Sequence, residues 1–113
     1  MANHITITPV SETVTVKAGG VKLGSSQQAL ELKEGGYPSV VYVPRQDIDL
    51  ALLARTNRES TCPWKGLASY YSIVTPTGTF ENAVWSYEAP KPEMAAIAGF
   101  MAFYTDRVEV TRG

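Results

Sequence analysis

Two Gly-Gly pairs, each lying between short stretches of alternating apolar and polar residues, constrain the fold of this chain more than any other feature. In TVTVK (13–17), Val14 and Val16 fall on one face of an extended chain, which is the period-two pattern of a half-buried strand. Gly19-Gly20 then supplies the positive-φ residues of a tight hairpin, and the chain returns as VKLGS. A β-hairpin is therefore predicted near the start of the chain.

The same scheme recurs further along. ALELKE (29–34) and SVVYV (39–43) flank the second pair, Gly35-Gly36, and the two hairpins together predict an antiparallel meander. ASYYSIV (68–74) and FENAVWSY (80–87) flank the turn TPTG and predict a further hairpin. FMAFY and RVEVT predict a closing strand pair.

Helical patterns in the sequence are short. In DIDLALLAR (47–55), Asp47 is a residue type favoured at a helix N-cap, and the leucines that follow favour a short, mostly apolar helix. Pro92 suits a first helical turn, and the apolar stripe that follows it is expected to end at Gly99. The predicted fold class is mainly β with a minor α component, two antiparallel sheets and two short helices, in a single domain over residues 1–113.

Composition and charge exclude several classes of function. With 44% hydrophobic and 19% charged residues, the 113-residue chain has the composition of a soluble globular domain large enough to bury a core. A net charge of −1 without a block of like charge argues against nucleic acid as a partner. No apolar run approaches the roughly 18 residues of a membrane span, and MANHITITP lacks the pattern of a signal peptide. We therefore expect no membrane partner and a cytoplasmic location.

Only two side chains, Cys62 and His4, belong to the residue types that bind zinc most often. A structural zinc site needs about four such ligands, so no metal is predicted, nor any other cofactor. A catalytic triad with a histidine base is disfavoured for the same reason, because His4 is the one histidine and lies near the start of the chain.

The stretch TCPWKGLASYY (61–71) concentrates reactive and aromatic side chains. Pro63 restricts Cys62 to an extended conformation and Gly66 permits a sharp turn, so a defined loop is expected between the first helix and the following hairpin. If Lys65 lay beside the sulfur, its charge would favour the thiolate, which makes Cys62 the candidate for a catalytic residue. The alternative is that Cys62 is a small buried apolar side chain, as free cysteines often are.

Two further segments carry candidate binding residues. In YVPRQDID (42–49), Arg45 suits a carboxylate or phosphate, and the alternative is that Arg45 pairs with Asp47 or Asp49. In WSYEAPKP (85–92), Trp85 and Tyr87 suit the wall of a pocket, although aromatic residues at alternate positions also suit a core.

Four segments, YVPRQDID, CPWKGLASYY, AVWSYEAPKPE and IAGFMAFYTDRVEV, together closely resemble the bacterial and fungal family known as domain of unknown function 427. The resemblance runs from about Glu12 to Val110, and the family has no established reaction. It implies a β-tent, in which two antiparallel sheets are pinned together at one end, similar to methionine sulfoxide reductase B and to zinc-binding β-tent domains. Those relatives carry paired CxxC motifs for zinc, which this chain lacks, so the resemblance does not extend to the metal.

The family motif also implies site residues by position. It falls on Pro44, Arg45, Asp47, Cys62, Pro63, Lys65, Gly66, Tyr70, Trp85, Tyr87, Pro90, Phe103 and Tyr104. Trp64 replaces the smaller aromatic residue that is common in the family, and Tyr42-Val43 replaces the usual aromatic residue before Pro44. Both replacements would reshape a pocket without removing its polar groups.

Three hypotheses about function follow. The first is that a small polar or anionic ligand binds in a cleft between the sheets, lined by Arg45, Asp47, Cys62, Lys65, Tyr70, Trp85 and Tyr87. The second is a non-catalytic protein-interaction module or homo-oligomer that uses an exposed aromatic patch at Tyr70, Tyr71 and Trp85. The third is a thiol-based enzyme, against which stands the single cysteine, because such reductases commonly use a second thiol.

Overall fold

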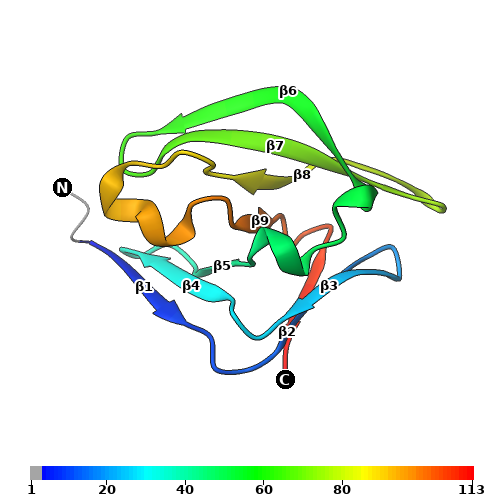
Figure 1. The fold of residues 1–113 in the computed structure, drawn as a ribbon, viewed down its shortest axis with the longest axis horizontal. Helices are drawn as coiled ribbons and strands as arrows, with labels where there is room; N and C mark the ends of the chain where they lie inside the picture. Colours follow the sequence, from blue (N-terminus) through cyan, green and yellow to red (C-terminus); the bar gives the residue numbers. More distant parts are fainter. Residues whose placement is uncertain (1–3) are drawn as a thin grey trace.

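The computed structural model describes residues 4–113 and contains three antiparallel sheets (Figure 1). Sheet A has the order β1 (Ile5–Pro9), β4 (Leu30–Glu34), β5 (Val40–Tyr42). Sheet B has the order β10 (Glu109–Arg112), β2 (Val14–Ala18), β3 (Val21–Ser26). Sheet C has the order β6 (Leu53–Cys62), β7 (Gly66–Thr75), β8 (Gly78–Ser86), β9 (Met101–Phe103).

The three hairpins predicted from the sequence are confirmed. β2 and β3 pair across Gly19 and Gly20, whose φ angles of 55° and 80° are those that glycine adopts most easily. β4 pairs with β5, and β7 pairs with β8, in the expected antiparallel sense. Alternation of buried and exposed residues along β2 matches the period-two pattern that predicted it.

The predicted arrangement of these hairpins in two sheets is wrong, because the structure has three. The first two hairpins do not form one meander: β1 takes the free edge of β4, and β10 takes the free edge of β2, so that each hairpin belongs to its own sheet. The predicted closing pair is also wrong, since β9 pairs with β8 and β10 with β2. Strand partners so distant in the chain leave no signal in a local pattern.

The helix predicted over 47–55 is wrong as well. The chain forms two single 3₁₀ turns, η1 (Arg45–Asp47) and η2 (Leu50–Leu52), and enters β6 at Leu53. Asp47 does not cap a helix, because its carboxylate accepts a 2.6 Å hydrogen bond from the Ser26 hydroxyl. Asp49 is the capping residue, and it accepts from the backbone N–H of Ala51 at 3.1 Å.

The second predicted helix is a 3₁₀ segment, η3 (Pro92–Ile97), instead of an α-helix. Pro92 occupies its start as expected, and Met94 and Ile97 are its buried residues. Gly99 follows with φ 76°, so the predicted end of the helical stripe is confirmed. No helix in residues 4–113 has both the length and the apolar character needed to cross a membrane.

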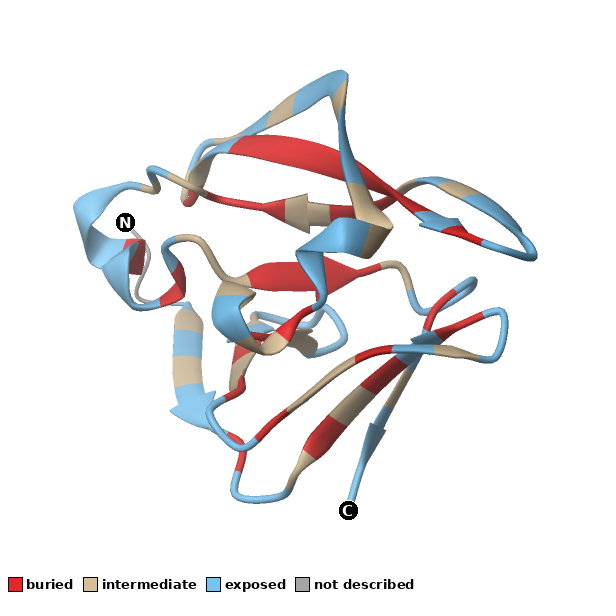
Figure 2. Cartoon of the chain, turned by 45° about the vertical axis from the view of Figure 1, so that its right-hand side comes forward, coloured by how far each residue is buried: buried red, intermediate tan, exposed pale blue. Residues whose placement is uncertain are grey.

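The core consists of two clusters, and buried positions concentrate where the sheets face one another (Figure 2). The larger cluster, with Val16, Leu23, Ile73 and Val84 fully buried, joins sheets B and C. The smaller cluster joins sheets A and C, and its fully buried residues include Leu32, Tyr42, Ala68, Ile97 and Ala102. Polar groups from several strands meet at the rim of this smaller cluster.

Candidate functional site

A pocket of about 260 Å³ opens between sheets A and C at the smaller core cluster. Six aromatic side chains line it: Tyr37, Tyr42, Tyr70, Trp85, Tyr87 and Tyr104. Lys65 and Glu34 supply its charged groups, and Leu32, Pro38 and Val40 complete the lining. We call this cavity the tyrosine pocket.

The charged end of the tyrosine pocket is an ion pair. The Lys65 Nζ lies 2.6 Å from the Glu34 Oε1, and the two side chains are only 9% and 20% exposed. The Lys65 Nζ also lies 5.9 Å from the centre of the Tyr87 ring, within the distance of a cation–π contact. The ammonium group is therefore held against an aromatic wall and away from bulk water.

The turn between β6 and β7 fixes Lys65 in this position. Gly66 has φ 112°, a conformation that disfavours other residues, and its Cα faces the chain at Pro90 and Lys91. The Lys65 carbonyl accepts a 2.9 Å hydrogen bond from the backbone N–H of Lys91. The defined loop expected at residues 62–66 is thus a hairpin turn that docks on the segment before η3.

Cys62 is half-buried at the end of β6, and its sulfur lies 3.7 Å from the Lys65 Nζ. The proximity considered from the sequence is therefore present, but the carboxylate of Glu34 engages the same ammonium group at shorter range. Cys62 packs against the smaller core cluster beside the tyrosine pocket.

Two tyrosine hydroxyls in the pocket stay protonated. Burial raises the pKa of Tyr42 to about 12, even though Trp85 donates a 3.4 Å hydrogen bond to its hydroxyl from Nε1. Burial also raises the pKa of Tyr87, and nearby tyrosine and carboxylate groups add to the effect. Both hydroxyls can therefore donate a hydrogen bond to a ligand at neutral pH.

Tyr70 and Tyr104 also line the tyrosine pocket. Burial opposes ionisation of Tyr70, but hydrogen bonds with Ser60, Tyr104 and Arg58 outweigh it, so the pKa of Tyr70 is lowered. The Tyr70 hydroxyl lies 2.9 Å from the Ser60 Oγ, and the Arg58 guanidinium sits 4.8 Å from its ring centre. Trp85 stacks at a tilt on Tyr104 with ring centres 4.6 Å apart.

Four of the predicted site residues, Lys65, Tyr70, Trp85 and Tyr87, come together in the tyrosine pocket, with Cys62 beside them. Arg45 and Asp47 are not among the residues that line it. Asp47 holds Ser26, as described above, and so connects η1 to sheet B.

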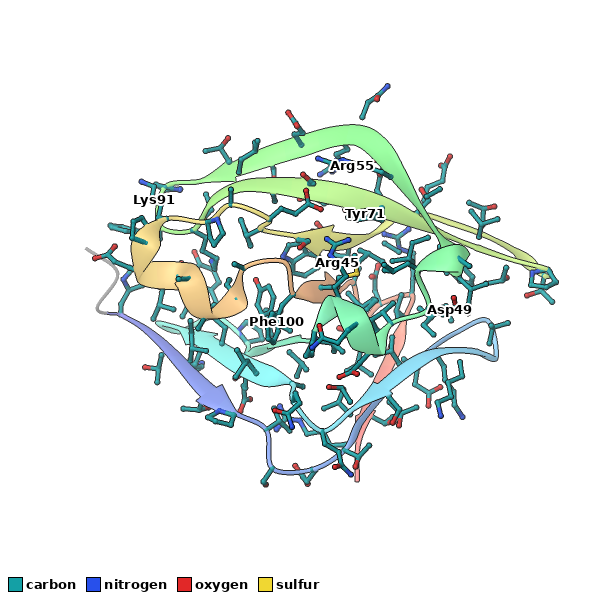
Figure 3. The ribbon with its side chains drawn as sticks, viewed as in Figure 1. Arg45, Asp49, Arg55, Tyr71, Lys91 and Phe100 are labelled. Atoms are coloured by element: carbon teal, nitrogen blue, oxygen red, sulfur yellow. The ribbon has the colours of Figure 1, made fainter. Side chains whose placement is uncertain are left out.

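Arg45 belongs to a separate polar network. The Arg45 Nη2 lies 2.8 Å from one carboxylate oxygen of Glu88, Oε2. The other oxygen of the same carboxylate, Oε1, lies 3.0 Å from the Arg55 Nη1. The Tyr71 hydroxyl donates to the same carboxylate, and the three labelled side chains Arg45, Arg55 and Tyr71 meet in Figure 3. Arg45 therefore pairs with neither Asp47 nor Asp49, because Glu88 already holds its guanidinium.

The predicted exposed aromatic patch at Tyr70, Tyr71 and Trp85 is wrong. Tyr70 and Tyr71 are only 5% and 8% exposed, and Trp85 is half-buried. Tyr70 and Tyr71 belong to the two core clusters and Trp85 packs against one of them, so the three rings do not form an exposed patch.

Sequence reasoning missed Glu34 and Tyr42. Glu34 ends a strand and pairs with a lysine 31 positions away, which no spacing rule reveals. Tyr42 departs from the family motif, and it lines the pocket while only 1% exposed. Residues 4–113 contain no group of three or more His, Cys, Asp or Glu side chains placed to hold a metal ion.

The Glu34–Lys65 pair makes stability depend on pH. The hydrogen bond from Lys65 lowers the pKa of Glu34 from its ordinary value of 4.5, and burial opposes this only in part. Because the folded-state pKa is the lower one, the pair stabilises the fold above the unfolded pKa, and this stability is lost as the pH falls through the folded pKa. We expect Glu34→Gln to lose less stability than wild type between about pH 6 and 3 in urea titrations.

Glu31 and Glu88, whose pKa values are also lowered, titrate in both proteins and cancel in this comparison. Parallel stability curves for wild type and Glu34→Gln would show that Glu34 is not held by Lys65.

In a comparison with protein-family models, the model of a domain of unknown function (DUF427) matches residues 6–113. No curated protein matches the sequence. The match covers nearly the whole chain, as the four sequence segments implied. The chain therefore belongs to the family described as a domain of unknown function, DUF427.

Proposed function

We propose that this chain binds a small polar or anionic ligand in the tyrosine pocket. The observation that carries the proposal is the convergence of a buried ammonium group, two protonated tyrosine hydroxyls and a half-buried indole on one aromatic cavity. Apolar walls with a few convergent polar groups are the usual composition of a ligand pocket.

The volume limits the size of the ligand. About 260 Å³ corresponds to the liquid volume of roughly eight or nine water molecules at about 30 Å³ each. A compound of about 10 to 15 non-hydrogen atoms, the size of a monosaccharide, a nucleobase or an amino acid, matches this space. Longer ligands would extend beyond the pocket.

The polar groups favour a ligand with an oxygen acceptor. An ammonium group has three N–H donors, and Glu34 and Cys62 account for two of the contacts that Lys65 makes. A carboxylate, phosphate or carbonyl oxygen would take the third. The flat rings of Trp85 and Tyr104 suit a planar or apolar body on the same ligand.

A protein-interaction or homo-oligomer function remains the second hypothesis, but it loses its original support because the proposed aromatic patch is buried. A thiol enzyme would rest on Cys62 alone, and its neighbour Lys65 is already paired with Glu34. Binding in the tyrosine pocket is therefore the function that we favour.

A fragment screen tests the proposal. We expect ligand-observed NMR on a library of small acids and amides to find hits that bind wild type and lose at least about tenfold in affinity in Tyr87→Phe, which removes a hydroxyl from the pocket wall. Tyr71→Phe is the matched control, because Tyr71 is not among the residues that line the tyrosine pocket. Hits that bind both variants and wild type equally would place the ligand elsewhere.

A further inference from the structure

Within residues 4–113, the facing strand edges of sheets A and C are joined at a single residue pair. β5 and β9 are the outer strands of their sheets and lie side by side at the centre of Figure 1. The backbone N–H of Val43 donates a hydrogen bond to the carbonyl of Met101, and the N–H of Met101 donates one to the carbonyl of Val43, each at 2.8 Å. This is the pairing of two residues in an antiparallel ladder.

The next pair of that ladder is open. In an antiparallel pair, residues two positions apart point their N–H and C=O groups to the same side, so Val41 and Phe103 would bond next. The alternation holds in β9, because Tyr104 bonds back to Ala83 on the β8 side. No backbone hydrogen bond joins Val41 to Phe103 in the part of the chain that the structure describes.

A cavity of about 490 Å³ lies between these open edges. Residues 40–41 line one side, residues 103–105 line the other, and Val110 and Arg112 lie with them. We call it the edge groove. It adjoins the tyrosine pocket, with which it shares Tyr37, Pro38, Val40, Trp85 and Tyr104.

We propose that the edge groove binds an extended peptide segment of a partner protein, which adds backbone hydrogen bonds to Val41 or Phe103. A sheet edge offers alternating N–H donors and C=O acceptors, and an extended polypeptide matches that alternation. The apolar lining from Val41, Phe103 and Val110 would receive alternate side chains of the segment.

A positively charged side chain at the edge groove favours a partner segment with an acidic group. Arg112 lines it, and its Nη2 is 3.0 Å from the Glu31 carboxylate. A guanidinium has five N–H donors, so Arg112 can hold a second carboxylate. The partner segment is therefore expected to carry an acidic side chain or a terminal carboxylate. Lys65 and Glu34 do not line the edge groove, so the inference does not rest on the function proposed for the tyrosine pocket, although the two cavities share part of their lining.

The test uses a displayed library of random decapeptides, selected on the full chain. We expect enriched peptides with apolar residues at alternate positions and a carboxylate. A synthetic copy should slow hydrogen exchange of the Val41 and Phe103 amides. Methylation of its central backbone nitrogens should weaken binding by about five- to tenfold, because each removes one hydrogen bond.

Val41→Pro removes the N–H that faces the groove, while Val41→Ile keeps it. We expect Val41→Pro to weaken the peptide about five- to tenfold and Val41→Ile to leave it within about twofold. Fragment binding in the tyrosine pocket should survive in both variants, which separates this result from a failure of the proposed function. If Val41→Pro does not fold, two measurements on wild type test the inference instead. They are the hydrogen exchange of the Val41 and Phe103 amides and the affinity of the backbone-methylated peptides.

Three outcomes would overturn the inference. The first is a selection that enriches no peptide. The second is binding that leaves exchange at Val41 and Phe103 unchanged. The third is protection of these amides that rises with protein concentration in the absence of peptide, which would make a second copy of the chain the occupant.

Discussion

Lys65→Met is expected to destabilise the fold by about 2 kcal/mol at pH 7. Breaking a fully buried ion pair costs about 3–5 kcal/mol, because the remaining charge loses its partner. Here the cost is lower, since the carboxylate left behind on Glu34 keeps 20% of its side chain exposed. Methionine preserves most of the apolar stem that packs in the wall of the tyrosine pocket.

A double-mutant cycle separates the charge effect from the packing effect. Lys65→Met combined with Glu34→Gln should cost less than Lys65→Met alone, because no unpaired charge remains. Lys91→Met is the matched control, since Lys91 is exposed at the left edge of Figure 3 and close to Lys65 along the fold. Urea denaturation measures wild type, the two single mutants, the double mutant and Lys91→Met, and equal losses for Lys65→Met and Lys91→Met would contradict the buried ion pair.

Gly24→Ala is expected to cost about 3 kcal/mol and to lower the melting temperature by roughly 10 °C. A Cβ on Gly24 would lie 2.0 Å from the backbone oxygen of Asp47, far inside contact distance. That oxygen cannot rotate away as a side chain can, because the segment after it is tied to β3 by the hydrogen bond from Asp49 to Leu23. The backbone itself must shift, and buried Ile48 must shift with it.

Gly36→Ala provides the control for this prediction. No heavy atom lies within 4 Å of a Cβ at Gly36, and its backbone conformation is one that alanine accepts. We expect a change within about 0.5 kcal/mol, with either sign. If calorimetry showed the two variants to be equally stable, the contact between β3 and η1 would be absent in solution.

The elements that could be predicted from the sequence are those with a local cause. β2, β4 and β7 show apolar alternation or a dense apolar run, and glycine or proline turns separate them from their partners. β6 shows no such pattern, because most of its residues are exposed, and only its pairing with β7 makes it a strand. The leucines of residues 50–53, most of which lie in η2 before the strand, therefore favour a helix in the sequence pattern.

In the candidate site, too, the contacts that could be predicted from the sequence are those between residues close together in the chain. Lys65 and Cys62 share one turn, so their proximity followed from spacing, whereas Lys65 and Glu34 meet through the packing of sheet A on sheet C. Arg45 does not line the predicted cleft, and its guanidinium instead donates a hydrogen bond to Glu88, a residue 43 positions away in the chain. Pairings between sheets depend on a topology that local patterns did not reveal.

The resonance of the Trp85 indole N–H in a heteronuclear NMR spectrum tests the central claim most directly. This group donates to Tyr42 at the floor of the tyrosine pocket, and Trp64→Phe assigns it by removing the other indole signal. We predict that fragment hits shift the Trp85 signal in a saturable manner, with the same dissociation constant that ligand-observed titration gives. Hits that bind while the Trp85 signal stays unmoved would contradict a ligand site in the tyrosine pocket.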